Sequence, residues 1–141
     1  MNIPIRLQVL EDGQFLSVKA LLDSGCTRLC MGRKYVQRNN IQTQKLARPI
    51  PVYNADGTLN QSGAITEFTE LHMILNDHVE RIQFAVTDLG EQDVFIGYEW
   101  LKKHNPDVDW QKETLYFSRC LDDCRYITTL DELDGDPKEQ V

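Results

Sequence analysis

Long apolar runs are missing from this sequence: no stretch comes near the roughly 20 consecutive apolar residues that a membrane-spanning helix needs. The sequence also has no cluster of basic residues. Its 15 Lys and Arg residues are outnumbered by 22 Asp and Glu residues, which gives a formal net charge of -7. Nucleic-acid binding relies on clustered Lys and Arg, so this balance argues against nucleic acid as the main partner. The N-terminal residues lack the charged-then-apolar layout of a signal peptide. We therefore expect a cytoplasmic protein that binds neither membrane nor nucleic acid and keeps its thiols reduced.

The patterning predicts one mostly-β domain. The 141 residues are 41% hydrophobic, which suits a single modest core, and the chain has no repeat of ~20 to 50 residues. Apolar and polar residues alternate on both sides of Asp12-Gly13, which predicts a hairpin over 3–22. A second pair of extended arms surrounds a polar tip with Asp56-Gly57, and two further strands meet at Asn76-Asp77. These turns separate short strands along most of the chain.

The last third of the chain combines a strand, a helix and another hairpin. "VFIG" is a compact apolar strand, and "YEWLKKHN" predicts a helix with Trp100 facing inward that ends before Pro106. Residues 108–117 predict a hairpin in which Val108 and Trp110 face Leu115 and Phe117. Residues 28–41 read as a loop or a short helical turn. The tail at 121–141 is acidic and poor in apolar residues, so we expect it to be flexible.

Four cysteines form two closely spaced pairs, Cys26 with Cys30 and Cys120 with Cys124. A site in which four thiolates bind zinc is conceivable. Structural zinc pairs usually have two residues between the cysteines, however, and both pairs here have three. We therefore favour two small core residues near Asp23 and two thiols late in the chain over a metal site.

The stretch "ALLDSGCTRLCM" places an acid, Asp23, where an apolar strand ends. Asp, Ser and Gly are ordinary turn residues, so the triplet alone is weak. A lone carboxylate delivered to the interior would be costly to desolvate. A second carboxylate facing Asp23 lowers this desolvation cost if the two groups share one proton, because the pair then carries a single charge. The chain has no second DSG or DTG triplet, so such a pair has to come from two chains related by a two-fold axis.

At this point the sequence resembles the retropepsin family, most closely the aspartic proteases of gypsy-type LTR retrotransposons of the fungal kind. "LLDSGCT" is similar to the active-site loop, "VYNADGTLNQSGAI" to the flap hairpin, and "VFIG" with "YEWLKKHNPDVDW" to the last strand, helix and following strand. The resemblance covers about Ile3 to Arg119. It implies an all-β, retropepsin-like closed β-barrel, half of a pepsin-type fold, with one short C-terminal helix. It also implies a two-fold dimer, with a protease domain at 1–120.

The resemblance also implies roles for the residues of the active-site loop. Asp23 matches the catalytic carboxylate. Ser24 matches the hydroxyl that locks the two loops of the dimer together. Gly25 matches the residue whose carbonyl lies along the substrate, where a side chain would block close approach. Cys26 and Thr27 match the floor of the cleft, although many relatives have Ala in place of Cys26, and a thiol there is open to oxidation.

The resemblance also implies which residues form the lid of the active site and which support the active-site loop. The flap tip around Ala55, Asp56 and Gly57 resembles the lid that closes over an extended peptide and excludes water. This flap is more polar than the Gly-rich flaps of the best-known retroviral enzymes. Ile96 and Gly97 resemble the pair that packs beneath the active-site loop, with Ile96 also bordering the substrate.

The expected function is therefore that of an aspartic endopeptidase without cofactor or metal. Its substrate would be an extended segment of the element's own Gag-Pol polyprotein, within retrotransposon virus-like particles, and its working form a homodimer. Its pH profile would be bell-shaped with a mildly acidic optimum.

Three other hypotheses stay open at this stage. One is a Cys-His hydrolase that uses Cys26 or Cys30 with one of the histidines; we expect all three to be half-exposed: His72, His78 and His104. A second is a catalytically weak or domesticated dimeric binding module with the same fold. A third is a domain that stays monomeric, and so nearly inactive, when isolated from its polyprotein.

Overall fold

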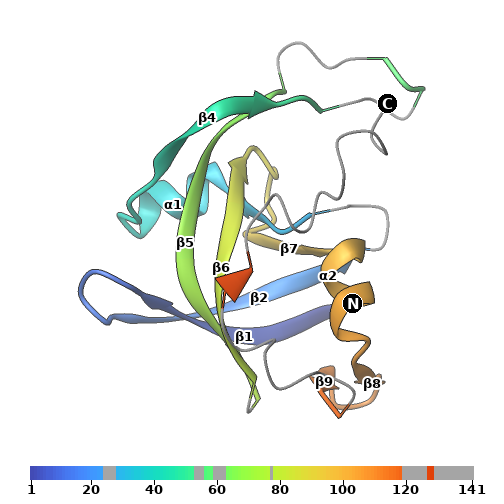
Figure 1. The fold of residues 1–141 in the computed structure, drawn as a ribbon. Coiled ribbons are helices and arrows are strands. Elements are labelled where there is room, and N and C mark those ends of the chain that lie inside the picture. The colour runs from blue at the N-terminus through green and yellow to red at the C-terminus, as the bar shows by residue number, and fades with distance from the viewer. Residues whose placement is uncertain (24–27, 53–55, 59–62, 77, 119–126, 129–141) are drawn as a thin grey trace.

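The computed structural model describes residues 1–23, 28–52, 56–58, 63–76, 78–118 and 127–128 (Figure 1). Ten strands and two helices lie in these ranges. The strands are β1 Asn2–Val9, β2 Phe15–Asp23, β3 Cys30–Gly32, β4 Gln44–Ile50, β5 Ile65–Leu75, β6 His78–Thr87, β7 Val94–Gly97, β8 Asp107–Asp109, β9 Thr114–Tyr116 and β10 Ile127–Thr128. The helices are α1 Arg33–Arg38 and α2 Tyr98–His104.

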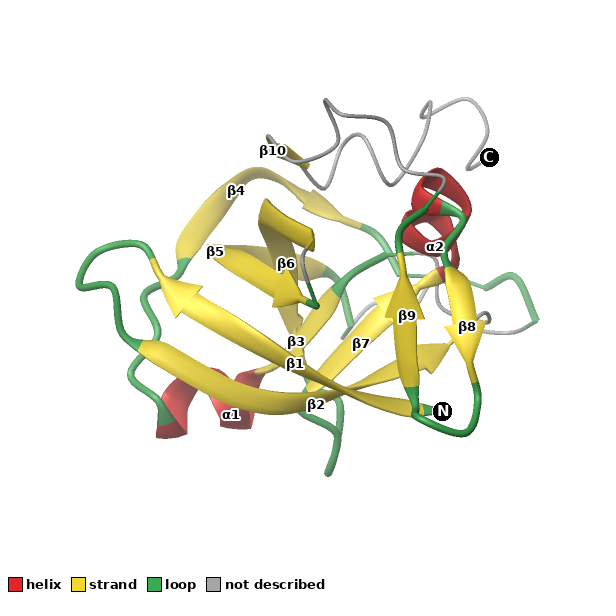
Figure 2. Ribbon diagram, turned by 90° about the horizontal axis from the view of Figure 1, so that it is seen from below, coloured by secondary structure: helices red, strands yellow, loops and turns green. Residues whose placement is uncertain are grey.

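Six of the strands form a closed barrel. They follow one another in the order β6, β3, β7, β2, β1, β5, and an antiparallel pairing of β5 with β6 closes the ring (Figures 1 and 2). β4 lies outside β5, β10 lies outside β6, and β8 pairs with β9 in a separate two-stranded sheet. Because closure removes free edges from the six strands, the barrel encloses a core. The predicted all-β closed barrel is confirmed.

The β1–β2 hairpin follows directly from the alternation of its sequence. Ile3, Ile5 and Leu7 are buried, while their polar neighbours on β1 face outward. Gly13 adopts a φ of 73° in the connecting turn, a conformation that glycine tolerates without strain. The register pairs Ile3 with Ala20 and Ile5 with Val18, so both strands direct their apolar residues to the same side. The predicted hairpin is confirmed.

Helix α2 also lies where the sequence places it. Trp100 is fully buried against the barrel and Leu101 packs on the same core. The helix ends at His104, because Asn105 takes the left-handed conformation (φ 44°) that closes many helices and Pro106 prevents continuation. The three basic residues of its last turn also suit the negative end of the helix dipole.

Some elements differ from expectation. The segment expected as a loop or short helical turn contains a complete strand, β3, as well as α1. Trp110 does not face Leu115; it lies in the turn between β8 and β9 and is 71% exposed. His78 and His104 are not half-exposed but almost fully buried, whereas His72 is partly exposed as expected.

The acidic segment at 121–141 contributes one short strand to the described structure. Ile127 and Thr128 pair in parallel with Arg81 and Ile82 of β6. Its other residues lie outside the described part, so the domain boundary at 120 stays a prediction. Among the described residues, no helix combines the length and the apolar character that crossing a membrane requires.

Candidate active site

Asp23 is the last residue of β2, a strand in the middle of the barrel wall. Its backbone is flanked on one side by β7, where it is in register with Gly97, and β1 lies on the other side of the strand. The amide of Leu22, one residue earlier, donates a hydrogen bond of 2.9 Å to the carbonyl of Met1. The backbone that carries the predicted catalytic residue is therefore held from both sides.

One strand, β7, fixes both ends of the segment at 24–27. It runs parallel to β2, with Leu22 opposite Ile96, and antiparallel to β3, with Met31 opposite Val94. Between the segment and β3, Leu29 is fully buried and its carbonyl accepts a hydrogen bond of 3.0 Å from the amide of Ala85. The chain on either side of residues 24–27 is thus anchored in the barrel.

Several predicted site residues lie outside the described part of the structure: Ser24, Gly25, Cys26, Thr27 and Ala55. Their roles stay predictions, as does the contact of Asp23 with its counterpart. Cys30 is described, and it is a buried free thiol. The zinc site with four thiolates cannot be placed, because its other three cysteines are outside the described residues: Cys26, Cys120 and Cys124.

Ile96 lies on β7, opposite Leu22 of β2. Its side chain is fully buried in the barrel core, one residue before the position that pairs with Asp23. Its expected packing beneath the active-site loop stays a prediction, because residues 24–27 lie outside the described part of the structure. Its contact with a substrate stays a prediction.

The predicted flap corresponds to β4 and β5, which are antiparallel and in register at Ile50 and Ile65. Their free end and the C-terminal end of β2 lie on the same side of the barrel in both views (Figures 1 and 2). β4 is an outer strand, and β5 is its one neighbour among the strands that the structure describes. This arrangement brings a hairpin tip and the predicted catalytic strand end to the same side of the molecule.

The tip of this hairpin contains a tight turn at 56–58. Gly57 has a φ of 88° with open space around it, and the hydroxyl and amide of Thr58 donate to Oδ1 of Asp56 at 2.6 and 3.0 Å. The hydrogen bond from the Thr58 hydroxyl, followed by that from its amide, holds the pKa of the Asp56 carboxyl below its ordinary value of 3.8. Both hydrogen bonds therefore favour the ionised form of Asp56.

Polar contacts fasten the base of the flap to the barrel. Glu67 on β5 accepts a hydrogen bond of 2.7 Å from Thr43 and pairs with Arg33 of α1 at 3.2 Å. The Thr43 hydrogen bond is the main reason that the pKa of Glu67 is lowered, and Arg33 adds to it. The Thr69 hydroxyl donates to the carbonyl of Gln42 at 2.8 Å. The two arms are thus cross-linked near the barrel, while the tip extends away from it.

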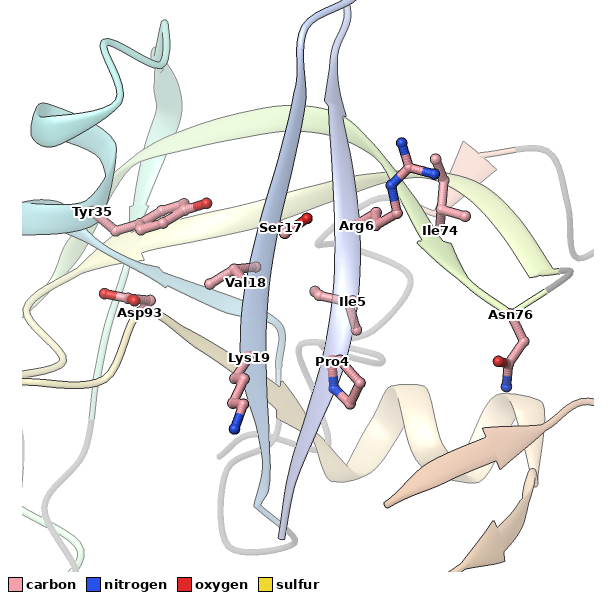
Figure 3. A pocket seen from close by; sticks show the side chains of 10 residues that line it. All are labelled: Pro4, Ile5, Arg6, Ser17, Val18, Lys19, Tyr35, Ile74, Asn76 and Asp93. Atoms are coloured by element: carbon pink, nitrogen blue, oxygen red, sulfur yellow. The ribbon is translucent and has the colours of Figure 1, made fainter. Parts of the chain in front are cut away.

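A groove of about 830 Å³ lies elsewhere, along β1 and β2 (Figure 3). Arg6 and Lys19 lie along it, and Tyr35 of α1 and Asp93 border it on one side. Burial raises the pKa of Tyr35, and the nearby Asp93 carboxylate raises it further. None of the predicted site residues lines this groove, so we assign it no part in the chemistry.

One polar cluster escaped the sequence analysis entirely. His78, Glu80 and His104 meet in the interior, and Trp100 donates its indole N–H to Glu80 at 3.3 Å. Two of these side chains were considered only as partners for a cysteine nucleophile. The signal that could have found them is the spacing His-x-Glu on a strand, which places both side chains on one face.

The chain resembles known proteins along most of its length. Residues 19–124 match the family model described as the PEG10/RTL1 protease domain. The retroviral protease-like domain of Ddi1 from Leishmania major superposes with a TM-score of 0.53 at 18% identity, covering 84% of this chain and 90% of that one. EIAV protease, in a complex with the inhibitor HBY-793, superposes with a TM-score of 0.52 at 11% identity, covering 77% of this chain and 91% of that one.

The two structural similarities establish the fold, and the family match includes Asp23, both arms of the flap and α2. The chain therefore belongs to the PEG10/RTL1 protease domain family and has the fold of the retroviral proteases.

Proposed function

We propose that the chain is an aspartic endopeptidase in which two copies each supply one Asp23. The observation that carries the proposal is the place of this residue. Asp23 ends a central strand of a retroviral-protease barrel, in register with Gly97, and Ser24 and Gly25 follow it in sequence. An acid that leaves an apolar strand at this point is suited to meet its symmetry mate across a two-fold axis.

The chemistry follows from the pairing of two carboxylates. Two like charges at close range share one proton, so one carboxylate is ionised and its partner is protonated. The ionised group takes a proton from a water held between them, while the protonated group polarises the scissile carbonyl. The tetrahedral intermediate collapses when a proton reaches the leaving nitrogen. We expect a bell-shaped pH profile with a mildly acidic optimum that belongs to the pair.

The substrate class follows from the position of the flap. A hairpin tip on the same side as the catalytic strand end would cover a peptide in extended form, binding it through backbone hydrogen bonds with alternate side chains in pockets. We propose that the natural substrate is a Gag-Pol polyprotein of a gypsy-type LTR retrotransposon of the fungal kind. Cleavage would then take place in virus-like particles in the cytoplasm.

The test uses a mixed peptide library between pH 4 and 7, with the wild-type chain, Asp23→Asn and the matched control Asp12→Asn. Asp12 is an exposed carboxylate in the β1–β2 turn, away from the end of β2 that carries Asp23. We expect Asp23→Asn to lose activity by a factor of about 10² to 10⁴ or more, since it removes the acid–base pair. Asp12→Asn should keep wild-type activity, and pepstatin should inhibit both active proteins.

Sedimentation of the same samples tests the dimer. Activity should fall more than proportionally on dilution, because each active site needs two chains. Cleavage that persists in Asp23→Asn, or that depends on a reduced thiol instead of Asp23, would rule out the aspartic mechanism. A dimer that binds peptides and cleaves none would identify the chain as a binding module.

A further inference from the structure

Three side chains with metal-binding atoms converge in the protein interior. His78 and Glu80 alternate with Val79 on β6, so both point to the same face, and His104 is the last residue of α2. Glu80 Oε1 lies 3.3 Å from His78 Nε2 and 2.9 Å from His104 Nε2. The three ligand atoms all lie within 4.8 Å of one another, and each residue is at most 3% exposed.

The donor set is specific in its chemistry. Two imidazole nitrogens and one carboxylate oxygen suit Zn²⁺ and similar transition ions, whereas Ca²⁺ and Mg²⁺ require oxygen ligands. Ligand bonds of about 2.0 Å in a tetrahedral arrangement place neighbouring ligand atoms about 3.3 Å apart. The two distances to Glu80 Oε1, 3.3 and 2.9 Å, are close to that spacing, so an ion could enter with small side-chain shifts.

The surroundings hold the three ligands in position. The Trp100 indole N–H donates to Glu80 Oε2 at 3.3 Å, which leaves Oε1 directed at both imidazoles. The His78 ring stacks on Phe117 at a centroid distance of 4.3 Å, and the His104 ring packs on Trp100 at 4.4 Å. A hydrogen bond that orients a ligating carboxylate, together with rings locked by packing, is typical of the surroundings of metal ligands in folded proteins.

We propose that His78 Nε2, Glu80 Oε1 and His104 Nε2 bind one divalent transition-metal ion of the Zn²⁺ class, with water as a fourth ligand. From the sequence alone we expected no metal site. The ion neutralises the buried carboxylate and joins the end of α2 to the start of β6. Because all three ligands are buried, the ion enters while the chain folds. The site is structural and stands independently of the proposed protease activity.

The first test is spectroscopic and uses the wild-type chain. The full chain is refolded after treatment with EDTA, with one equivalent of Co²⁺, and its visible spectrum and metal content are measured. We expect about one Co²⁺ per chain and d–d bands of a tetrahedral site. Ligation by any of the four cysteines would add an intense thiolate-to-cobalt band in the near ultraviolet. No binding, or a spectrum with that band, would overturn the proposal.

The second test measures stability and compares two histidines. Refolding with Zn²⁺ at one hundred times its Kd should raise Tm by about 10 °C. His72→Gln changes the histidine outside the cluster and should keep this increase, whereas His104→Gln should lose it. An equal increase in both variants would overturn the site. If His104→Gln does not fold, ¹¹³Cd NMR of the wild-type chain decides: a shift typical of nitrogen and oxygen ligands supports the site, and any other result overturns it.

Discussion

The two tryptophans of this chain offer a direct measure of the buried cluster. Trp100 is fully buried and its indole N–H donates to Glu80 Oε2 at 3.3 Å, whereas Trp110 is 71% exposed. Replacing either with Phe keeps an aromatic ring and removes one N–H group. The two variants therefore make the same chemical change in opposite environments.

The expected cost of Trp100→Phe is about 3 kcal/mol. A hydrogen bond to a charged group contributes about 1.5 to 3 kcal/mol, and replacing an indole by a phenyl ring in a packed core adds about 1 kcal/mol. Trp110→Phe should change stability by about 0.5 kcal/mol or less, as surface substitutions usually do. With an m-value of about 2 kcal/mol per molar urea, Trp100→Phe should lower the unfolding midpoint by roughly 1.5 M.

Urea unfolding at pH 7 in EDTA, followed by far-UV circular dichroism, measures both variants with the same probe and keeps metal ions out. Each variant also retains one tryptophan, whose fluorescence reports on a single site. A difference of less than about 1 kcal/mol between the unfolding free energies of the two variants would contradict the expected cost of Trp100→Phe. In that case the indole N–H would not be stabilising the Glu80 carboxylate.

Two further predictions concern the flap tip and the strand beside the active-site loop. An NMR titration should give Asp56 a pKa below its ordinary value of 3.8, and Thr58→Val should raise it towards that value. Because the pKa of Asp56 is lower in the folded state, its carboxylate stabilises the turn at pH values above the unfolded pKa. This stabilisation is lost as the pH falls through the folded pKa. A wild-type pKa at or above 3.8 would contradict the prediction. Gly32→Ala should reduce the free energy of unfolding by about 1 to 3 kcal/mol, because the added Cβ would lie 2.9 Å from the backbone oxygen of Gln92. An unchanged urea midpoint would contradict this and show that the Gln92 backbone moves aside without cost.

The strands with a clear alternation could be predicted from the sequence. Ile3, Ile5 and Leu7 alternate with exposed residues, so the first hairpin and the side chains that face the core could be predicted. Trp100 and Pro106 likewise marked the face and the end of α2. β3 could not be read in this way, because three residues are too few to show a period of two.

The interior cluster could not be predicted for a different reason. His78 and His104 belong to separate elements, and their burial depends on how α2 packs against β6. Local patterning carries no information about that packing, and histidine is common on both surfaces and interiors. The position of Asp23 was predictable, since it stands at the end of an apolar strand, whereas its pairing with a second carboxylate stays a proposal.

The parallel pairing of β2 with β7 has a consequence for the order of events during synthesis. Asp23 is made early, yet its neighbour in the sheet, Gly97, is made only after the flap and both long strands. Contacts between such distant segments form late in folding, because a long loop must close first. A ribosome-bound chain with fewer than about 100 residues exposed cannot fix the backbone beside Asp23. The backbone beside Asp23 is therefore completed only after β7, the strand that pairs with it, has been synthesised.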